Sequence, residues 1–142
     1  MASKSKQTLI LLLRLGIGSI FVIAGVGKLL DPASFLVEVS NYQILPDSCL
    51  SAITWFLPTL EIVVGSSLIF NWWLKEAGQI LLGLILIFTL AILSAWFRDL
   101  NIECGCFGDL GDWGSYPVWI ARNVMLAGGL IYLVSYTALD LD

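Results

Sequence analysis

Apolar residues fall into four long runs along the chain, separated by short polar stretches. The hydrocarbon core of a bilayer is about 30 Å thick, and about 20 apolar residues cross it as a helix. We therefore expect four spans, at about residues 8–30, 52–70, 77–97 and 117–136. Because the connections are short, consecutive helices should be antiparallel neighbours. The pattern predicts an all-α integral membrane four-helix bundle with short loops, forming a single domain over residues 1–142.

The first apolar run is predicted to be a membrane anchor that stays in the protein. Lys4 and Lys6 precede it, as basic residues precede the apolar segment of a signal peptide. The run is longer than the roughly 7–15 apolar residues of such a peptide, and Arg14 interrupts it. We therefore expect a span at this position and no cleaved leader.

Composition excludes most water-soluble classes of protein. Hydrophobic residues make up 58% of the 142 residues and charged residues 13%, about half the usual charged share. A soluble domain could not build a polar surface from so few charges. The seven Lys and Arg form no basic stripe, so nucleic acid is not an expected partner. The chain has no His, which removes the commonest metal ligand and the usual acid–base residue.

Basic residues between the spans predict the orientation of the chain. If the helices alternate, Lys4, Lys6 and Lys75 lie on one side, and Lys28 and Arg98 lie at the edge of the other. The positive-inside rule then places both termini in the cytoplasm. We expect a multi-pass protein of the plasma (inner) membrane, with the lipid bilayer as its surroundings.

Two of the three cysteines form the run Cys104-Gly105-Cys106, in the loop before the fourth predicted span. The orientation above places this loop and Cys49 on the extracytoplasmic side, which is the oxidising side. A disulfide across one residue needs a sharply bent backbone, which Gly105 can adopt. So small a ring is strained, and a strained, exposed disulfide is more oxidising than a structural one. The pair is therefore predicted to suit thiol–disulfide exchange better than stabilisation of the fold.

Other roles for the cysteines stay open. They could be small buried apolar side chains, although Gly, Asp and Glu flank the pair. A structural zinc site takes four Cys or His ligands, and three Cys without His do not supply them, so no metal is predicted. A disulfide to Cys49, or a relay in which Cys49 is the resolving thiol, is compatible with the sequence.

Four charged residues lie within the predicted spans or at their ends: Arg14, Lys28, Glu61 and Arg122. Such residues are costly in a bilayer and usually point into the bundle, paired with one another. Lys28, Glu61 and Arg122 lie at about the depth of the cysteine loop, so an ion pair of Glu61 with Lys28 or Arg122 could fix helix packing. Alternatively, positive charge of these side chains that Glu61 does not neutralise would stabilise a cysteine thiolate. Arg14 is nearer the cytoplasmic end, where its side chain can reach the interface.

Several of these positions resemble a known superfamily of membrane proteins, the DoxX-like proteins. The matching residues are Arg14-x-Gly16, Ala24-Gly25-x-Gly27-Lys28, Asp31-Pro32, Phe35, Asn41-Tyr42, Leu45-Pro46 and Leu57-Pro58-x-Leu60-Glu61-x-x-x-Gly65. The run Cys104-Gly105-Cys106-Phe107-Gly108, followed by Arg122-Asn123, resembles the MauE branch of that superfamily. The resemblance covers nearly the whole chain.

The resemblance implies a four-helix membrane protein with a redox function. MauE-like proteins are thought to act with thioredoxin-like partners when disulfides form in exported methylamine dehydrogenase. Other DoxX-like members are subunits of membrane oxidoreductase complexes that deliver electrons to quinone. The resemblance thus implies a thioredoxin-like or exported partner, and it makes quinone a candidate cofactor.

The leading hypothesis is a membrane-embedded thiol–disulfide redox protein, a candidate disulfide oxidoreductase. Cys104 and Cys106 would exchange electrons with a thioredoxin-like or exported protein. The electrons would leave through a soluble thioredoxin-like domain or a quinone, although no sequence feature identifies a quinone pocket. The alternative hypothesis is a non-enzymatic accessory or assembly subunit of a larger membrane oxidoreductase complex, in which the cysteines are structural.

Overall fold

The computed structural model describes residues 4–102 and 114–139. Its helices are α1 (Lys4–Leu30), α2 (Pro32–Asn41), α3 (Asp47–Phe70), α4 (Leu74–Phe97) and α5 (Tyr116–Leu139). All but α2 are long and apolar enough to cross a membrane. The prediction of an all-α membrane helical bundle is confirmed.

The long helices extend beyond the apolar runs that predicted them. α3 begins at Asp47 rather than near residue 52, and α5 continues to Leu139. Hydropathy marks the part of a helix that fits the hydrocarbon core, whereas the polar residues at its ends also keep helical hydrogen bonds. The helices therefore begin or end up to five residues outside the predicted spans.

The short helix α2 is an element that the hydrophobic pattern does not predict. Asp31 caps its start: the Asp31 Oδ1 atom accepts a hydrogen bond from the backbone N–H of Ser34 at 3.1 Å. The Ser34 hydroxyl donates to Asp31 Oδ2 at 2.7 Å. Pro32 follows, at the position where its missing N–H costs nothing. The connection between the first two spans is therefore a ten-residue helix rather than a short loop.

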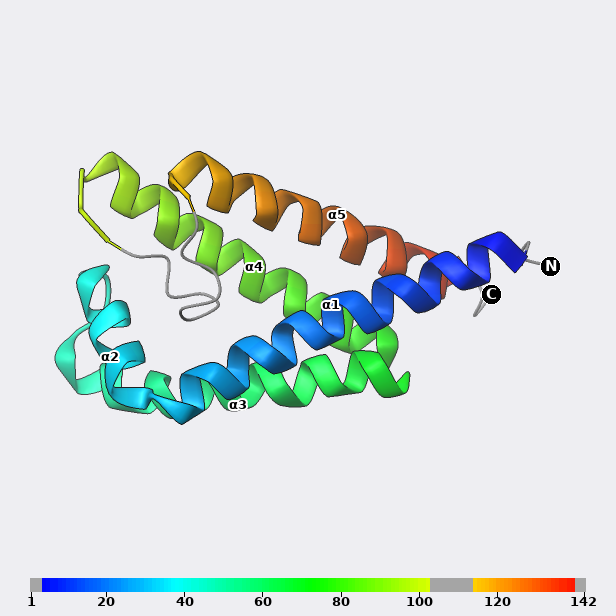
Figure 1. Cartoon of the computed structure of the whole chain (residues 1–142), viewed down its shortest axis with the longest axis horizontal. Coiled ribbons are helices and arrows are strands. Elements are labelled where there is room, and N and C mark those ends of the chain that lie inside the picture. Colours follow the sequence, from blue (N-terminus) through cyan, green and yellow to red (C-terminus); the bar gives the residue numbers. More distant parts are fainter. Residues whose placement is uncertain (1–3, 103–113, 140–142) are drawn as a thin grey trace.

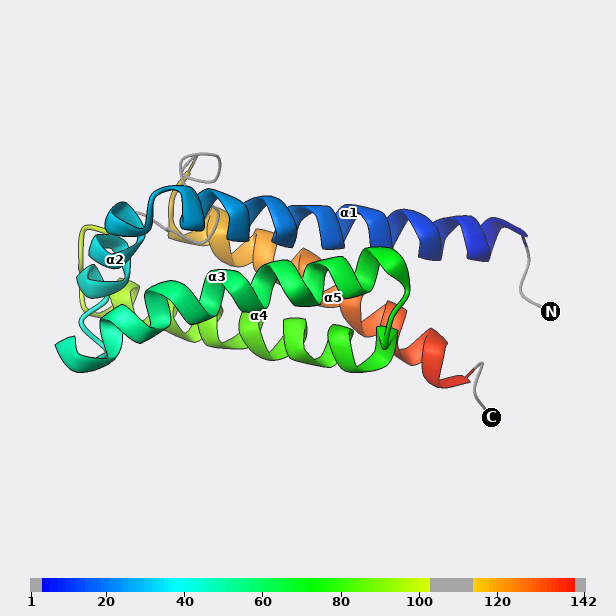
Figure 2. The ribbon, with the colours of Figure 1, turned by 90° about the horizontal axis from the view of Figure 1, so that it is seen from below.

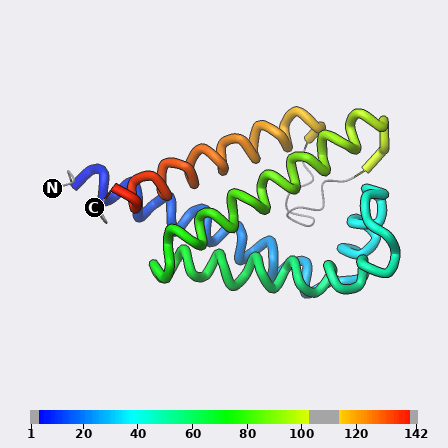
Figure 3. The backbone as a smooth tube through the Cα atoms, turned by 180° about the vertical axis from the view of Figure 1, so that it is seen from behind, coloured from blue at the N-terminus to red at the C-terminus, as the bar shows by residue number. Residues whose placement is uncertain are grey.

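The bundle consists of two helix pairs, α1 with α3 and α4 with α5 (Figure 1). The start of α1 and the end of α5 lie at one end of the bundle, and α2 lies at the other end (Figure 2). The two pairs lie closest at the end without α2 and diverge toward α2 (Figure 3). The interior is therefore wider at the α2 end.

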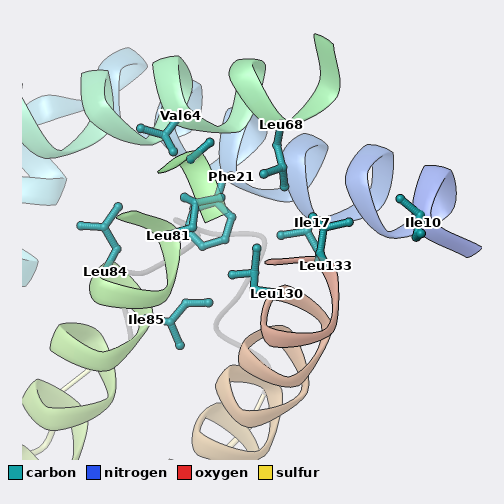
Figure 4. Packing of buried hydrophobic residues seen from close by; sticks show 11 residues of the cluster. Ile10, Ile17, Phe21, Val64, Leu68, Leu81, Leu84, Ile85, Leu130 and Leu133 are labelled. Carbon is teal, nitrogen blue, oxygen red and sulfur yellow. The ribbon is translucent and has the colours of Figure 1, made fainter. Parts of the chain in front are cut away.

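The larger of two apolar clusters among the described residues, called the core below, lies where all four long helices meet, in the half of the bundle away from α2. Figure 4 shows this packing, in which Phe21 of α1, Leu68 of α3, Leu81 of α4 and Leu130 of α5 are almost fully buried. The same half holds Leu133, the next buried position of α5. Burial of these side chains holds the two helix pairs together at this end.

Helices α1 and α3 approach each other closely at glycine positions. A Cβ atom added to Gly25 would lie 2.7 Å from the carbonyl oxygen of Pro58. One added to Gly18 would lie 2.8 Å from the carbonyl oxygen of Gly65. Small residues let helix backbones come together in a membrane, where van der Waals packing drives association. This close approach brings the charged side chains of α1 and α3 within reach of each other.

Candidate functional site

A buried ion pair joins α1 to α3. The Lys28 ammonium lies 2.8 Å from both carboxylate oxygens of Glu61, and the two side chains are each 1% exposed. Of the two partners expected for Glu61, Lys28 is the one in contact. Gly25, one turn before Lys28 in α1, lies directly against the Glu61 region of α3. The close approach of the two helices therefore sets the distance between the charges.

Two aromatic rings cover the ammonium group on its other sides. The Lys28 Nζ atom lies 5.3 Å from the centre of the Phe35 ring of α2 and 5.6 Å from that of Phe88 of α4. Both distances fall in the range of cation–π attraction. In the sequence, Phe35 stands out only through the family pattern, and Phe88 is one more apolar position of its run. Only the packing of α2 and α4 identifies these rings as part of the charged site.

Arg14 binds backbone carbonyls at the opposite end of the bundle. Its Nε atom donates to the carbonyl oxygen of Leu68 at 3.1 Å, and Nη2 donates to that of Ile69 at 3.0 Å. These carbonyls belong to the last turn of α3, where the regular helical hydrogen bonds end and the Leu68 carbonyl accepts only a 3.4 Å bond from the backbone N–H of Asn71 among the described backbone groups. The Arg14 side chain thus caps the end of α3.

The facing ends of α4 and α5 are joined by aromatic and polar contacts. The Tyr116 ring stacks on Trp96 with ring centres 5.9 Å apart, and the Tyr116 hydroxyl donates to the carbonyl oxygen of Leu100. Deeper in the pair, the Asn123 side-chain amide donates to the Thr89 hydroxyl at 3.1 Å. These contacts hold together the two helix ends that residues 103–113 connect.

The end of α4 is also tied to the end of α2. The Arg98 guanidinium donates to the carbonyl oxygen of Tyr42 at 3.0 Å and to the Gln43 side-chain oxygen at 3.3 Å. Arg122, the remaining charged candidate, is half-buried on α5 beside Asn123. The α2 end of the bundle therefore carries Lys28, Glu61, Arg98 and Arg122.

The structure places one of the three candidate cysteines. Cys104 and Cys106 lie outside the described residues. Cys49 is exposed in the first turn of α3, at the α2 end of the bundle. The exchange reaction, a disulfide to Cys49 and the relay through Cys49 stay predictions.

A cavity of about 520 Å³ lies between α2, α3 and α4. Lys28 and Phe88 are at its wall, together with Leu57, Leu60 and Leu84. The cavity occupies the space that opens where the two helix pairs diverge. Its wall is almost entirely apolar.

Comparison with known proteins places the chain in a family. The profile of the family described as "Methylamine utilisation protein MauE" matches residues 6–136. The methylamine utilization protein MauE of Paracoccus denitrificans is 30% identical over 96 residues, which cover 67% of this chain and 52% of that relative. The chain thus matches about half the length of this curated relative. No solved structure matches. Because the family profile covers nearly the whole bundle, this multi-pass membrane protein belongs to the MauE family.

Proposed function

We propose that the chain is a membrane-embedded thiol–disulfide redox protein whose exchanging pair is Cys104 and Cys106. The observation that carries the proposal is the Cys104-Gly105-Cys106 run in the connection between α4 and α5 of a MauE family member. A strained, exposed disulfide favours exchange over stabilisation. The relative is named for methylamine utilisation. We extend that setting to this chain, with an exported protein or its thioredoxin-like partner as the substrate.

The proposed reaction moves two electrons from the partner to the cysteine pair. A thiolate of the partner attacks the Cys104–Cys106 disulfide, which forms a mixed disulfide and releases one cysteine of the pair as a thiolate. The second partner thiolate attacks the mixed disulfide, so the partner becomes oxidised and the pair becomes a dithiol. A second thioredoxin-like disulfide or a quinone then takes the two electrons and restores the pair.

The surrounding helix ends support this use of the connection. Tyr116 joins the first turn of α5 to Leu100, just beyond the end of α4, so both attachments of the segment are held together. Arg98 joins the same region to the end of α2. A fixed base of this kind would present the cysteine pair to a partner at one end of the bundle. With both termini in the cytoplasm, that end is extracytoplasmic.

The Lys28–Glu61 pair is proposed to position the helices. Each charge is neutralised by the other, since the ammonium contacts both carboxylate oxygens at 2.8 Å. A pair of this kind leaves little net positive charge to stabilise a thiolate at a distance. Its contribution to the redox site would therefore be the fixed spacing of α1 and α3.

Trapping of a mixed disulfide tests the proposal. In the Cys106→Ser variant, or in Cys104→Ser, the remaining thiolate can attack the disulfide of the oxidised partner, which is the reverse of the second step, and no neighbouring cysteine then resolves the mixed disulfide. We expect one of the two variants to form a reductant-sensitive adduct with a redox partner on non-reducing gels, and Cys49→Ser to form none. Absence of an adduct from both variants would favour the accessory-subunit function.

A redox titration provides an independent measurement. Thiol alkylation of membranes poised at a series of potentials should show Cys104 and Cys106 changing together, as a two-electron couple with a tenfold change in ratio per roughly 30 mV. Cysteines that stay reduced at every potential would contradict the exchange reaction. The Cys49→Ser variant shows whether Cys49 shares the couple, because its loss would then shift the titration.

A further inference from the structure

The cavity between α2, α3 and α4 has the dimensions of a ligand site. Its volume of about 520 Å³ lies within the roughly 300–1,000 Å³ of small-molecule pockets. It lies in the α2 half of the bundle and borders the core at Leu84, which belongs to both. Packing of the side chains of residues 4–102 and 114–139 leaves this space open.

The cavity follows one leaflet of the membrane in depth. At one end it is lined by Ile44 and Leu45, in the connection between α2 and α3. Its deepest lining residue on α4 is Leu84, which lies thirteen residues before Phe97, the last residue of that helix. Thirteen residues of helix rise about 20 Å, which is more than half of a hydrocarbon core of about 30 Å. The cavity therefore runs from the level of α2 through that leaflet to just past the middle of the bilayer.

The mouth of the cavity faces the lipid. Phe56 of α3 is 66% exposed and Ile87 of α4 is 61% exposed, and both line the cavity. These side chains belong to spans, so their exposed surfaces meet lipid rather than water. A molecule already in the membrane can enter sideways between α3 and α4.

The chemistry of the wall selects a hydrocarbon chain. The deep lining residues Leu57, Leu84 and Ile87 are apolar, and the Lys28 ammonium is already held by Glu61 and two aromatic rings. The polar lining residues Glu38 and Tyr42 lie on α2 and at its end, at the opposite end of the cavity from Leu84. A ligand with a polar ring in the deep part would meet no matching group among the described lining residues, whereas a hydrocarbon chain can fill the apolar wall by van der Waals packing, which drives association inside a membrane.

We propose that the cavity binds one acyl chain of a phospholipid from the leaflet on the α2 side. The glycerol end of the lipid lies near Tyr42 and the chain terminus near Ile87. The bound chain covers the cavity side of the Lys28–Glu61 pair and keeps water from it. Exclusion of water strengthens the attraction between the two charges, because that attraction depends on a low local dielectric constant. The inference is independent of the redox function.

Photo-crosslinking in nanodiscs tests the site. The probe is a phosphatidylcholine that carries a diazirine on one acyl chain, either at the terminal carbon or near the carboxyl group. The terminal probe should label residues around Ile87, and the other probe should label residues around Leu45. Both should exceed the labelling of Met125, which is 78% exposed on α5 and reports ordinary lipid contact.

A matched pair of variants separates a bound chain from ordinary lipid. Ala91→Phe fills the cavity from α4 and should reduce labelling around Ile87 to the level at Met125. Ala121→Phe places the same ring on an exposed position of α5, outside the cavity, and should leave labelling unchanged. If Ala91→Phe does not fold, Ala91→Leu adds a smaller side chain and should reduce labelling partially. Equal labelling of cavity and Met125 in the wild type, or displacement of the probe by a short-chain quinone, would overturn the assignment.

Discussion

Lys28 and Glu61 show how this chain keeps two charges inside a membrane. A buried pair is often no more stable than a pair of apolar side chains, because removing both charges from water is costly. Removal of one partner is different, since it leaves a single charge without compensation. The two carboxylate contacts and the two rings around Lys28 match this requirement for complete pairing.

The Lys28→Met variant should lose about 3–5 kcal/mol of unfolding free energy, because Glu61 remains buried without its partner. The double variant Lys28→Met with Glu61→Leu should recover most of that loss. Unfolding by sodium dodecyl sulfate in mixed micelles measures both values. A double variant as unstable as the single one would show that the pair contributes more than mutual neutralisation.

Helix α1 is fitted to α3 along a face of small residues. Gly25 and Gly18 lie against backbone carbonyls of α3. A Cβ atom added to Gly27, two residues from Gly25, would instead meet open space, with no atom within 4 Å. The amino-acid sequence alone does not distinguish the two kinds of glycine. They differ in the direction in which they face.

Gly25→Ala should destabilise the bundle by about 1–3 kcal/mol, because the added methyl group meets the Pro58 carbonyl and the helices must separate. Gly27→Ala is the matched control and should cause no loss of stability. The same micelle titration measures both. A loss of equal size in the two variants would mean that the close contact between α1 and α3 does not limit stability.

Helix α2 depends on a titratable cap. Hydrogen bonds from the Ser34 hydroxyl and backbone N–H favour the charged form of Asp31 and hold its pKa below the usual value. This pKa is lower in the folded chain than in the unfolded chain. The cap therefore stabilises α2 fully at pH values above the pKa of Asp31 in the unfolded chain, and the stabilisation is lost as the pH falls through the pKa of Asp31 in the folded chain. Hydrogen-exchange protection of Ser34 and Phe35 should therefore decrease at acidic pH. Asp31→Asn, which caps without titrating, should show no such decrease in this pH range.

The sequence predicts the long helices better than their contacts. Four apolar runs are enough for the spans, since the bilayer requires about 20 such residues in each. The spacing of Lys28, Glu61 and Arg122 predicts a common depth but not which cation faces Glu61, because that depends on the rotation of each helix. The signals for α2 are present in Asp31, Pro32 and Ser34, as a cap followed by proline, but not in hydropathy. The cavity depends on the divergence of the helix pairs, which no local pattern encodes.

At the scale of the whole molecule, the two ends of the bundle differ in structure and in proposed surroundings. The α2 end carries the ion pair, the cavity and the attachments of the cysteine segment, and the other end carries the apolar core. The proposed function requires the α2 end to face the oxidising side, where a disulfide persists. The proposed thiol–disulfide exchange therefore requires that the α2 end face the extracytoplasmic side.

Labelling with a membrane-impermeant maleimide tests that orientation. With Cys104→Ser and Cys106→Ser, the exposed Cys49 should react in intact cells. Glu76→Cys, added after removal of all three cysteines, lies in the first turn of α4 and should react only after permeabilisation. The reverse result would place Cys104 and Cys106 in the cytoplasm and would contradict the proposed exchange with an exported protein.

The partners of Arg14 and Lys28 have a consequence for biogenesis. Both cations belong to α1, and the oxygen atoms that bind them, the carbonyls of Leu68 and Ile69 and the carboxylate of Glu61, belong to α3. A span with charged residues inserts at a cost until those charges are compensated. Until α3 has entered the bilayer, neither cation of α1 has its oxygen partners. The first two spans, α1 and α3, should therefore insert as one cooperative unit, and a chain truncated before α3 should insert poorly.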